Sequence, residues 1–164
     1  MQIIQQDLKN LKYVYAPGVT KIYMAAFLGC NSITFVSGDH PIDNVTEGVY
    51  LPELKETVGF AFADNPNLIS VSLPKLEILG DWKGYDFRNC TKLREIDLPE
   101  LTIIGEGSFK NVPNLKGEFY ITKKIKTIKM GAFEQTGVTS FEVDKDNKNF
   151  YSDGYGLYSK GELF

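Results

Sequence analysis

The chain has 164 residues, of which 43 % are apolar and 24 % are charged, and its formal net charge is −3. These values are ordinary for a folded protein, and they give no reason to expect nucleic acid or an anionic membrane surface as a partner. No apolar run approaches the ~20 residues that span a bilayer, so membrane insertion is not expected.

A short pattern recurs from Leu11 onward: an alternating apolar strand, a proline, a second apolar pair, a loop and a phenylalanine. Copies occupy residues 11–30, 48–65, 68–90, 93–112 and 115–136, and a partial copy begins at 138–143. The prolines are Pro17, Pro52, Pro74 and Pro99, with Thr122 in their place in the fifth copy. The phenylalanines are Phe27, Phe62, Phe87, Phe109 and Phe133.

The spacing of these copies indicates the fold class. The last three phenylalanine intervals are 25, 22 and 24 residues, within the window of leucine-rich repeats. A unit this short cannot bury its own apolar side, so stacked units share one core. Proline cannot donate to a sheet ladder, so each strand ends there and the chain turns to a second wall. We therefore predict an α/β-type, mostly β repeat solenoid. It is a right-handed leucine-rich repeat of about five to six coils, with short parallel strands, few helical turns and the phenylalanines in one column.

The copies depart from the pattern at three places. The interval from Phe27 to Phe62 is 35 residues, about half a repeat too long. Residues 33–36 fit a strand, and residues 38–44 fit an excursion that precedes the strand at Val49. The third copy carries the extra residues DWKGYD at 81–86, and the fifth has one additional residue.

No set of residues in the chain predicts catalysis, a metal site or a cofactor. The single histidine, His40, lies in the excursion, where sequence neighbours rarely reach the geometry of a catalytic triad. Cys30 and Cys90 occupy the same template position. Two strand steps of ~4.8 Å separate them by roughly 10 Å, beyond the reach of a disulfide, so we expect two buried thiols.

Two stretches carry a resemblance to a known family. The fourth copy resembles the repeats of the BspA-like leucine-rich repeat family, in LREIDLP at 93–99 and IGEGSF at 104–109. The tail resembles the segment that follows such repeats, with the sequence NKNFYSDGYGLYSKGELF at 147–164. The resemblance implies a solenoid with a binding or adhesion role and a location at the cell surface or in the secreted fraction. The first ten residues, MQIIQQDLKN, have neither the basic start nor the apolar centre of a secretory signal, so a cytoplasmic location stays open.

The outward positions of the strands form a candidate binding surface. In leucine-rich repeat proteins they line the concave face, and we call this surface the ladder face. Its candidate residues are Tyr13, Tyr15, Tyr50, Ser72, Glu95, Asp97, Glu118, Tyr120 and Glu142. Tyrosine supplies contact area at low entropic cost, and neighbouring carboxylates favour a basic partner. The alternative is that solvent-facing strand positions simply favour tyrosine and charge.

The insertion of the third copy supplies a second candidate surface. It places Trp82 and Tyr85 at a corner of the coil, either as a plug on the convex side or as an exposed contact site. An exposed Trp82 would favour the contact site.

Two functions are compatible with these features. The first is a non-catalytic module that binds a protein, such as a host or matrix protein, or a glycan. The second is a spacer or stalk within a larger surface protein. We expect residues 1–143 to form the solenoid and residues 144–164 to form a turn and a β-hairpin, as a cap or the start of a further segment. Solenoid ends need caps, so end-to-end association of two copies is also an expectation.

Overall fold

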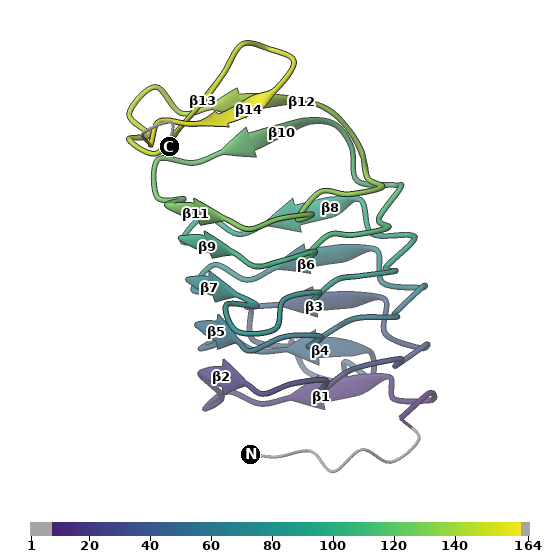
Figure 1. Cartoon of the computed structure of the whole chain (residues 1–164). Helices are drawn as coiled ribbons and strands as arrows, with labels where there is room; N and C mark the ends of the chain where they lie inside the picture. Colours follow the sequence, from purple (N-terminus) through teal and green to yellow (C-terminus); the bar gives the residue numbers. More distant parts are fainter. Residues whose placement is uncertain (1–7, 162–164) are drawn as a thin grey trace.

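The computed structural model describes residues 8–161, so residues 1–7 and 162–164 of the two predicted domains lie outside the described residues. The chain winds as a right-handed solenoid with its coils stacked along one axis (Figure 1). All regular structure from residue 8 to residue 161 is β-strand, and the loops are turns rather than helices. The predicted mostly β repeat fold with short parallel strands is confirmed.

The ladder face is the outer surface of two parallel sheets. The first has the strand order β1-β4-β3-β6-β8. Its strands are β1 (Tyr13–Tyr15), β4 (Gly48–Tyr50), β3 (Phe35–Ser37), β6 (Ser70–Ser72) and β8 (Glu95–Asp97). The second sheet pairs β10 (Lys116–Ile121) with β12 (Gly137–Val143).

The opposite wall is a five-stranded parallel sheet with the order β11-β9-β7-β5-β2. Its strands are β2 (Lys21–Ile22), β5 (Glu56–Thr57), β7 (Ile78–Leu79), β9 (Ile103–Ile104) and β11 (Thr127–Ile128). An antiparallel hairpin of β13 (Phe150–Ser152) and β14 (Leu157–Ser159) follows the last coil, and it buries Phe150 against the core. The role of this hairpin as a cap stays a prediction.

The five repeat phenylalanines form the predicted column inside the solenoid. Successive ring centroids, from Phe27 to Phe133, lie 5.3, 5.4, 5.8 and 5.7 Å apart. The first four rings are almost completely buried. Each coil therefore contributes one aromatic layer to a continuous core, which no single coil could bury by itself.

Two sharp corners flank each phenylalanine of the column. The residues two positions before and two positions after it all have φ between 53° and 68°. They are Ala25, Phe60, Tyr85, Gly107 and Gly131 before it, and Gly29, Asp64, Asn89, Asn111 and Gln135 after it. Glycine, asparagine and aspartate tolerate this left-handed conformation best, which explains their recurrence in the second set. Asn111 Nδ2 donates to Asn89 Oδ1 at 2.8 Å, and Asn89 Nδ2 donates to Asp64 Oδ1 at 2.5 Å, so the corners are linked.

The long first interval produces an additional strand. β3 follows the first coil, as expected, and pairs with β6. The chain then makes the predicted excursion, and β4 enters the sheet between β1 and β3. The ladder side thereby carries five strands from β1 to β8, whereas the opposite wall carries four from β2 to β9 (Figure 1).

Candidate binding surface

The register of the sheets places every predicted ladder residue on the outward rows. In the large sheet, one row runs through Tyr13, Gly48, Phe35, Ser70 and Glu95, and the other through Tyr15, Tyr50, Ser37, Ser72 and Asp97. On the smaller sheet, Glu118 is opposite Ser140 and Tyr120 is opposite Glu142. The residues of β3 belong to these rows although the sequence analysis left them out. That the rows bind a partner stays a prediction.

The rows begin with an aromatic cluster, which we define as Tyr13, Tyr15, Phe35, Tyr50 and His40. The Tyr50 ring lies 6.0 Å from that of Tyr13 and 5.5 Å from that of Phe35, with an edge contact in the second case. Tyr50 is consequently only 8 % exposed, whereas Tyr13 and Tyr15 are 37 % and 40 % exposed. Burial raises the pKa of Tyr50 above the ordinary value of a tyrosine. The cluster is therefore a packed floor with two accessible tyrosines.

Gly48 explains why Phe35 can lie across the sheet. A Cβ at position 48 would lie 2.2 Å from the Phe35 ring, so only glycine leaves room for it. Sequence reasoning missed Phe35 because it predicted a strand at residues 33–36 but assigned none of that strand's residues to the ladder face. The signal in the sequence was Gly48. It has no side chain at a ladder position next to Tyr13 and Tyr50, which leaves space for a large neighbouring side chain.

The excursion stands beside this cluster as a wall. A hydrogen bond of 2.7 Å joins Tyr15 Oη to His40 Nδ1, and the two rings meet edge to face at 5.9 Å. Ser37 Oγ donates to Asp39 Oδ2 at 3.0 Å, which fixes the start of the loop. A hollow of about 360 Å³ lies between the loop and the sheet, with Ile42 and Ser72 on its two sides. His40 is exposed, as predicted for a loop histidine, but it also fixes the Tyr15 side chain.

The far half of the ladder face is acidic. Glu95, Asp97, Glu118 and Glu142 are all exposed. Glu95 pairs with Arg94 at 3.2 Å, whereas the other three carboxylates make no ion pair within residues 8–161. This half of the face therefore carries negative charge that the described part of the chain leaves unneutralised.

The corner insertion separates its two aromatic residues. Trp82 is 71 % exposed, and Lys83 Nζ lies 4.6 Å from its ring centroid, so Trp82 is not a plug. Tyr85 is held in place, because its ring stacks on Phe60 at 5.3 Å and its hydroxyl donates to Glu106 Oε1 at 2.8 Å. Only Trp82 is available as a contact residue.

Asp86 is the most unusual buried group of the chain. It occupies the position before the column phenylalanine, where other coils have Ala26, Ala61, Ser108 and Ala132. The side chain is fully buried, Oδ1 accepts the Ala61 N–H at 3.4 Å, and Oδ2 has no hydrogen-bond partner in the described chain. Burial raises the pKa of Asp86 to about 7, against the hydrogen bond from the Ala61 N–H, which favours the carboxylate.

The two cysteines are free thiols in the core. Burial raises the pKa of Cys30 to about 11 and that of Cys90 to about 12. Cys90 Sγ donates to the Phe62 carbonyl at 3.1 Å. Within residues 8–161, no three His, Cys, Asp or Glu side chains are grouped so as to hold a metal ion.

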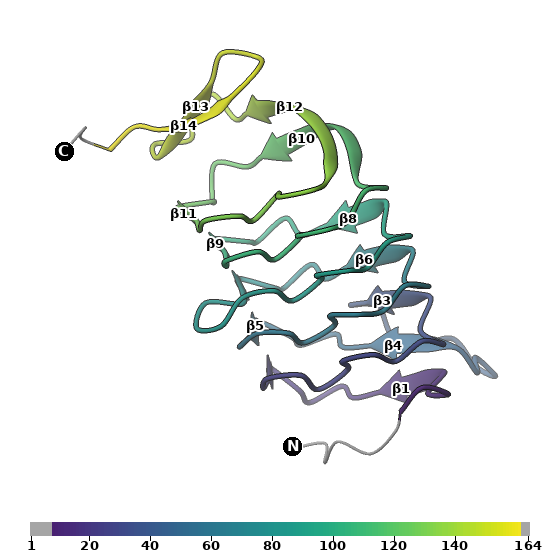
Figure 2. The same cartoon turned by 45° about the vertical axis from the view of Figure 1, so that its right-hand side comes forward.

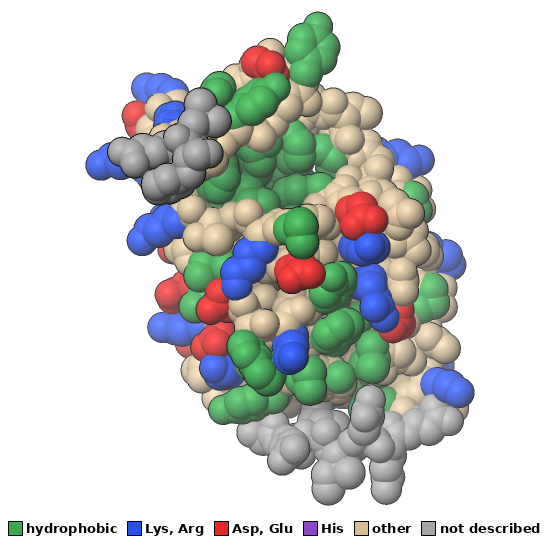
Figure 3. Space-filling view, viewed as in Figure 1, with side chains coloured by type: hydrophobic (Ala, Val, Ile, Leu, Met, Phe, Trp, Pro, Cys, Tyr) green, Lys and Arg blue, Asp and Glu red, His purple; other side chains and the backbone are tan. Residues whose placement is uncertain are grey.

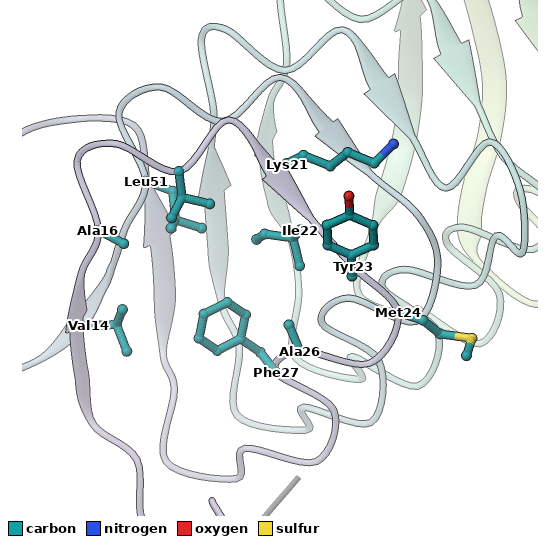
Figure 4. A pocket seen from close by; sticks show the side chains of 10 residues that line it. Val14, Ala16, Lys21, Ile22, Tyr23, Met24, Ala26, Phe27 and Leu51 are labelled. Atoms are coloured by element: carbon teal, nitrogen blue, oxygen red, sulfur yellow. The ribbon is translucent and has the colours of Figure 1, made fainter. Parts of the chain in front are cut away.

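The first coil contains a small apolar cavity. Its cavity, of about 60 Å³, is lined by residues that include Val14, Ile22, Phe27 and Leu51 (Figure 4). The side chains of Tyr23 and Met24 stand at its rim and are exposed. In the part of the chain that the structure describes, no helix is long and apolar enough to cross a membrane.

With the coils and their outward rows established, the chain can be compared with known proteins. Residues 47–156 match the BspA type leucine rich repeat region, in six copies. This match covers more than half of the chain, so the chain belongs to the BspA type leucine-rich repeat family. No curated protein matches the chain.

Two solved structures share the fold. The leucine rich repeat protein TpLRR of T. pallidum is 24 % identical with a TM-score of 0.60, and the match covers 75 % of this chain and 51 % of TpLRR. The pneumococcal vaccine antigen PcpA is 21 % identical with a TM-score of 0.59, and the match covers 89 % of this chain and 38 % of PcpA. The chain thus spans about half the length of the first protein and less of the second.

Proposed function

We propose that the chain is a non-catalytic binding module that presents its ladder face to a protein or glycan partner in an adhesion-type role. The aromatic cluster carries this proposal. Its floor is rigid, because Phe35 and Tyr50 pack edge to face, and two tyrosines remain about 40 % exposed above it. Rigid tyrosines with exposed hydroxyl groups are the residues that recognition surfaces favour.

The proposal includes display outside the cell. Its support is the family, together with the printed description of PcpA as a vaccine antigen, which is said of that protein. Exposed Trp82 is proposed as a secondary contact residue at the corner insertion.

The experiment uses beads coated with the chain. Their adhesion is measured on purified fibronectin, laminin and collagen, and the soluble chain is applied to a glycan array. A double variant, Tyr13→Ser with Tyr15→Ser, should lose most of the binding. The matched control is Tyr155→Ser, which removes a tyrosine that is 89 % exposed on the hairpin, at the opposite end of the solenoid from the aromatic cluster (Figure 1). Equal binding by the double variant would refute the role of the cluster.

The second candidate function is a spacer within a larger surface protein. The first coil favours it, because the exposed side chains of Tyr23 and Met24 beside its apolar cavity offer a surface on which another coil can stack. The same end could pair with that of a second copy. Sedimentation at about 5 and about 200 µM distinguishes a spacer from an end-paired dimer. A dimer paired through this end dissociates on dilution, whereas a spacer has the same mass at both concentrations. A chain that binds no surface would favour the spacer.

A further inference from the structure

The ladder side of the solenoid is interrupted between the fourth and fifth coils. Within residues 8–161, β8 pairs with β6 alone and β10 pairs with β12 alone. On the opposite wall the same two coils stay joined, because β9 pairs with β11. Figures 1 and 2 both show β10 farther from β8 than the other neighbouring strands are from each other.

The cause of the interruption lies in the fifth repeat. Leu115 to Ile121 spans six residue steps, where Leu93 to Leu98 spans five. Gly117 has φ +80° and lies at an irregularity in the register with β12, where Gly117 is opposite Val138 and Glu118 is opposite Ser140. The next inward residue is Phe119, where the preceding coils have valine or isoleucine and β12 has Phe141, and its ring lies 4.7 Å from that of Phe133. The added residue and the larger inward ring distinguish β10 from the strands of the continuous sheet.

The result is a groove of about 520 Å³ along the two strand edges, within the size range of ligand pockets. Its floor is apolar and includes Ile96, Leu98, Leu115 and Phe119. Figure 3, which has the same orientation as Figure 1, shows hydrophobic side chains in a hollow below the β13–β14 hairpin.

Both edges present backbone groups to the groove. The Glu95 N–H bonds to Ile69 and the Asp97 carbonyl accepts from Leu73, so both residues turn their backbone groups toward β6. Alternation along a strand therefore directs the N–H and C=O of Ile96 into the groove. The Ile121 carbonyl accepts from Asp144 on the β12 side.

By the same alternation, Glu118 and Tyr120 direct their backbone groups into the groove. Two open edges that face each other across an apolar floor form a template for an added strand.

We propose that this groove, which we call the β8–β10 groove, binds an extended peptide in which branched apolar residues alternate with lysine or arginine. Alternate side chains of a strand point to opposite faces. One set would enter the floor beside Ile96 and Phe119, which are only partly buried in the free chain. The other set would lie on the ladder face, between Asp97 on β8 and Glu118 on β10.

Charge selects lysine or arginine for the outward set. Asp97 and Glu118 are exposed and make no ion pair within the described residues. Arg94 directly precedes β8 and Lys116 begins β10, and both would repel cationic side chains there. The lysine or arginine side chains of the peptide are therefore expected beside Asp97 and Glu118. The proposal goes beyond the proposed function and is independent of the aromatic cluster, which lies at the other end of the large sheet.

The test measures the fluorescence anisotropy of a labelled peptide of alternating valine and lysine, titrated with the whole chain. The comparison peptides are an alternating valine and glutamate sequence, and one with the same valines and lysines in separate blocks. We expect only the alternating valine and lysine peptide to bind. Absence of binding at chain concentrations up to about 1 mM would overturn the proposal.

Variants of the chain identify the groove as the site. Charge reversal by Asp97→Lys with Glu118→Lys should weaken binding about tenfold or more, whereas the matched control Glu47→Lys, an exposed position outside the groove, should not. Equal affinity in both variants would overturn the proposal. A Tyr13→Ser, Tyr15→Ser double variant should bind the peptide normally, so this test and that of the proposed function fail separately.

Amide hydrogen exchange gives a second readout that does not depend on affinity. The amides of Ile96 and Tyr120 should exchange quickly in the free chain and become protected when the peptide binds. Protection of both amides without peptide would show that the sheet is closed, and would refute the groove itself.

Discussion

Replacing the buried Asp86 by asparagine should stabilise the chain, and the gain should increase with pH. The carboxyl group is fully buried, and one of its oxygens has no hydrogen-bond partner among the described residues, so the fold opposes its ionisation. The folded pKa of about 7 lies above the unfolded value. A group with this shift costs nothing below the unfolded pKa, and its cost increases as the pH rises to the folded pKa.

The magnitude follows from the two pKa values. With an unfolded pKa near 3.9, ionisation of Asp86 lowers the free energy of unfolding by about 1–2 kcal/mol at pH 5 and by about 4 kcal/mol at pH 8. The asparagine side chain does not titrate, so whatever its burial costs is the same at every pH. The stability difference between the Asp86→Asn variant and the natural chain should therefore grow by about 2–3 kcal/mol from pH 5 to pH 8.

Urea denaturation followed by circular dichroism, at pH 5, 6, 7 and 8, measures this difference. The matched control is Asp43→Asn, because Asp43 is exposed in the excursion, and its stability difference should stay constant. A difference for Asp86→Asn that is the same at pH 5 and pH 8 would refute the reasoning. It would mean that the carboxyl group ionises as easily in the folded chain as in the unfolded one.

Three further predictions concern the core and the corner insertion. Truncating the central ring by Phe87→Ala should lower the free energy of unfolding by about 3–5 kcal/mol, because a fully buried layer of the column is lost. The exposed control Ile42→Ala should change it little, and similar urea midpoints for both variants would contradict the column. Cys30 and Cys90 should react with a thiol reagent only when the chain unfolds, because both thiols are buried and have raised pKa values. Fast reaction in native buffer would contradict the burial of these thiols. Trp82 should show the red-shifted emission of a solvated indole and be quenched by acrylamide; a blue-shifted, protected spectrum would place it inside.

The repeat pattern predicted the core because core positions depend on local periodicity. Alternation along a strand decides which side chains point inward, and the interval between copies decides which of them meet. Phe62, Phe87 and Phe109 therefore stack as expected. The same arithmetic located the strand at β3 and the excursion after it.

The ladder face was harder to predict because it depends on the order of strands, which periodicity does not encode. β3 and β4 are parallel and both fit the template, but their positions in the sheet follow from the path of a ten-residue loop. This order brings Phe35 over Gly48 and covers Tyr50, so a residue that points outward is nevertheless buried. The extra residue of the fifth repeat was visible in the sequence. Its effect on strand pairing was not, because an extra residue can either form a bulge within a continuous sheet or separate two strands.

The two sides of the solenoid differ in how freely they can vary. Successive phenylalanine rings keep a spacing of 5.3 to 5.8 Å through all five layers, and the wall from β2 to β11 pairs without a break. Both irregularities of the strand order, the extra strand β3 and the parting of β8 from β10, fall on the ladder side, whereas the insertion at 81–86 lies at a corner after β7. The phenylalanine column and the opposite wall therefore fix the rise of the coils. The ladder side can gain a strand or open a groove without disturbing the core, which is a physical reason to look for binding there.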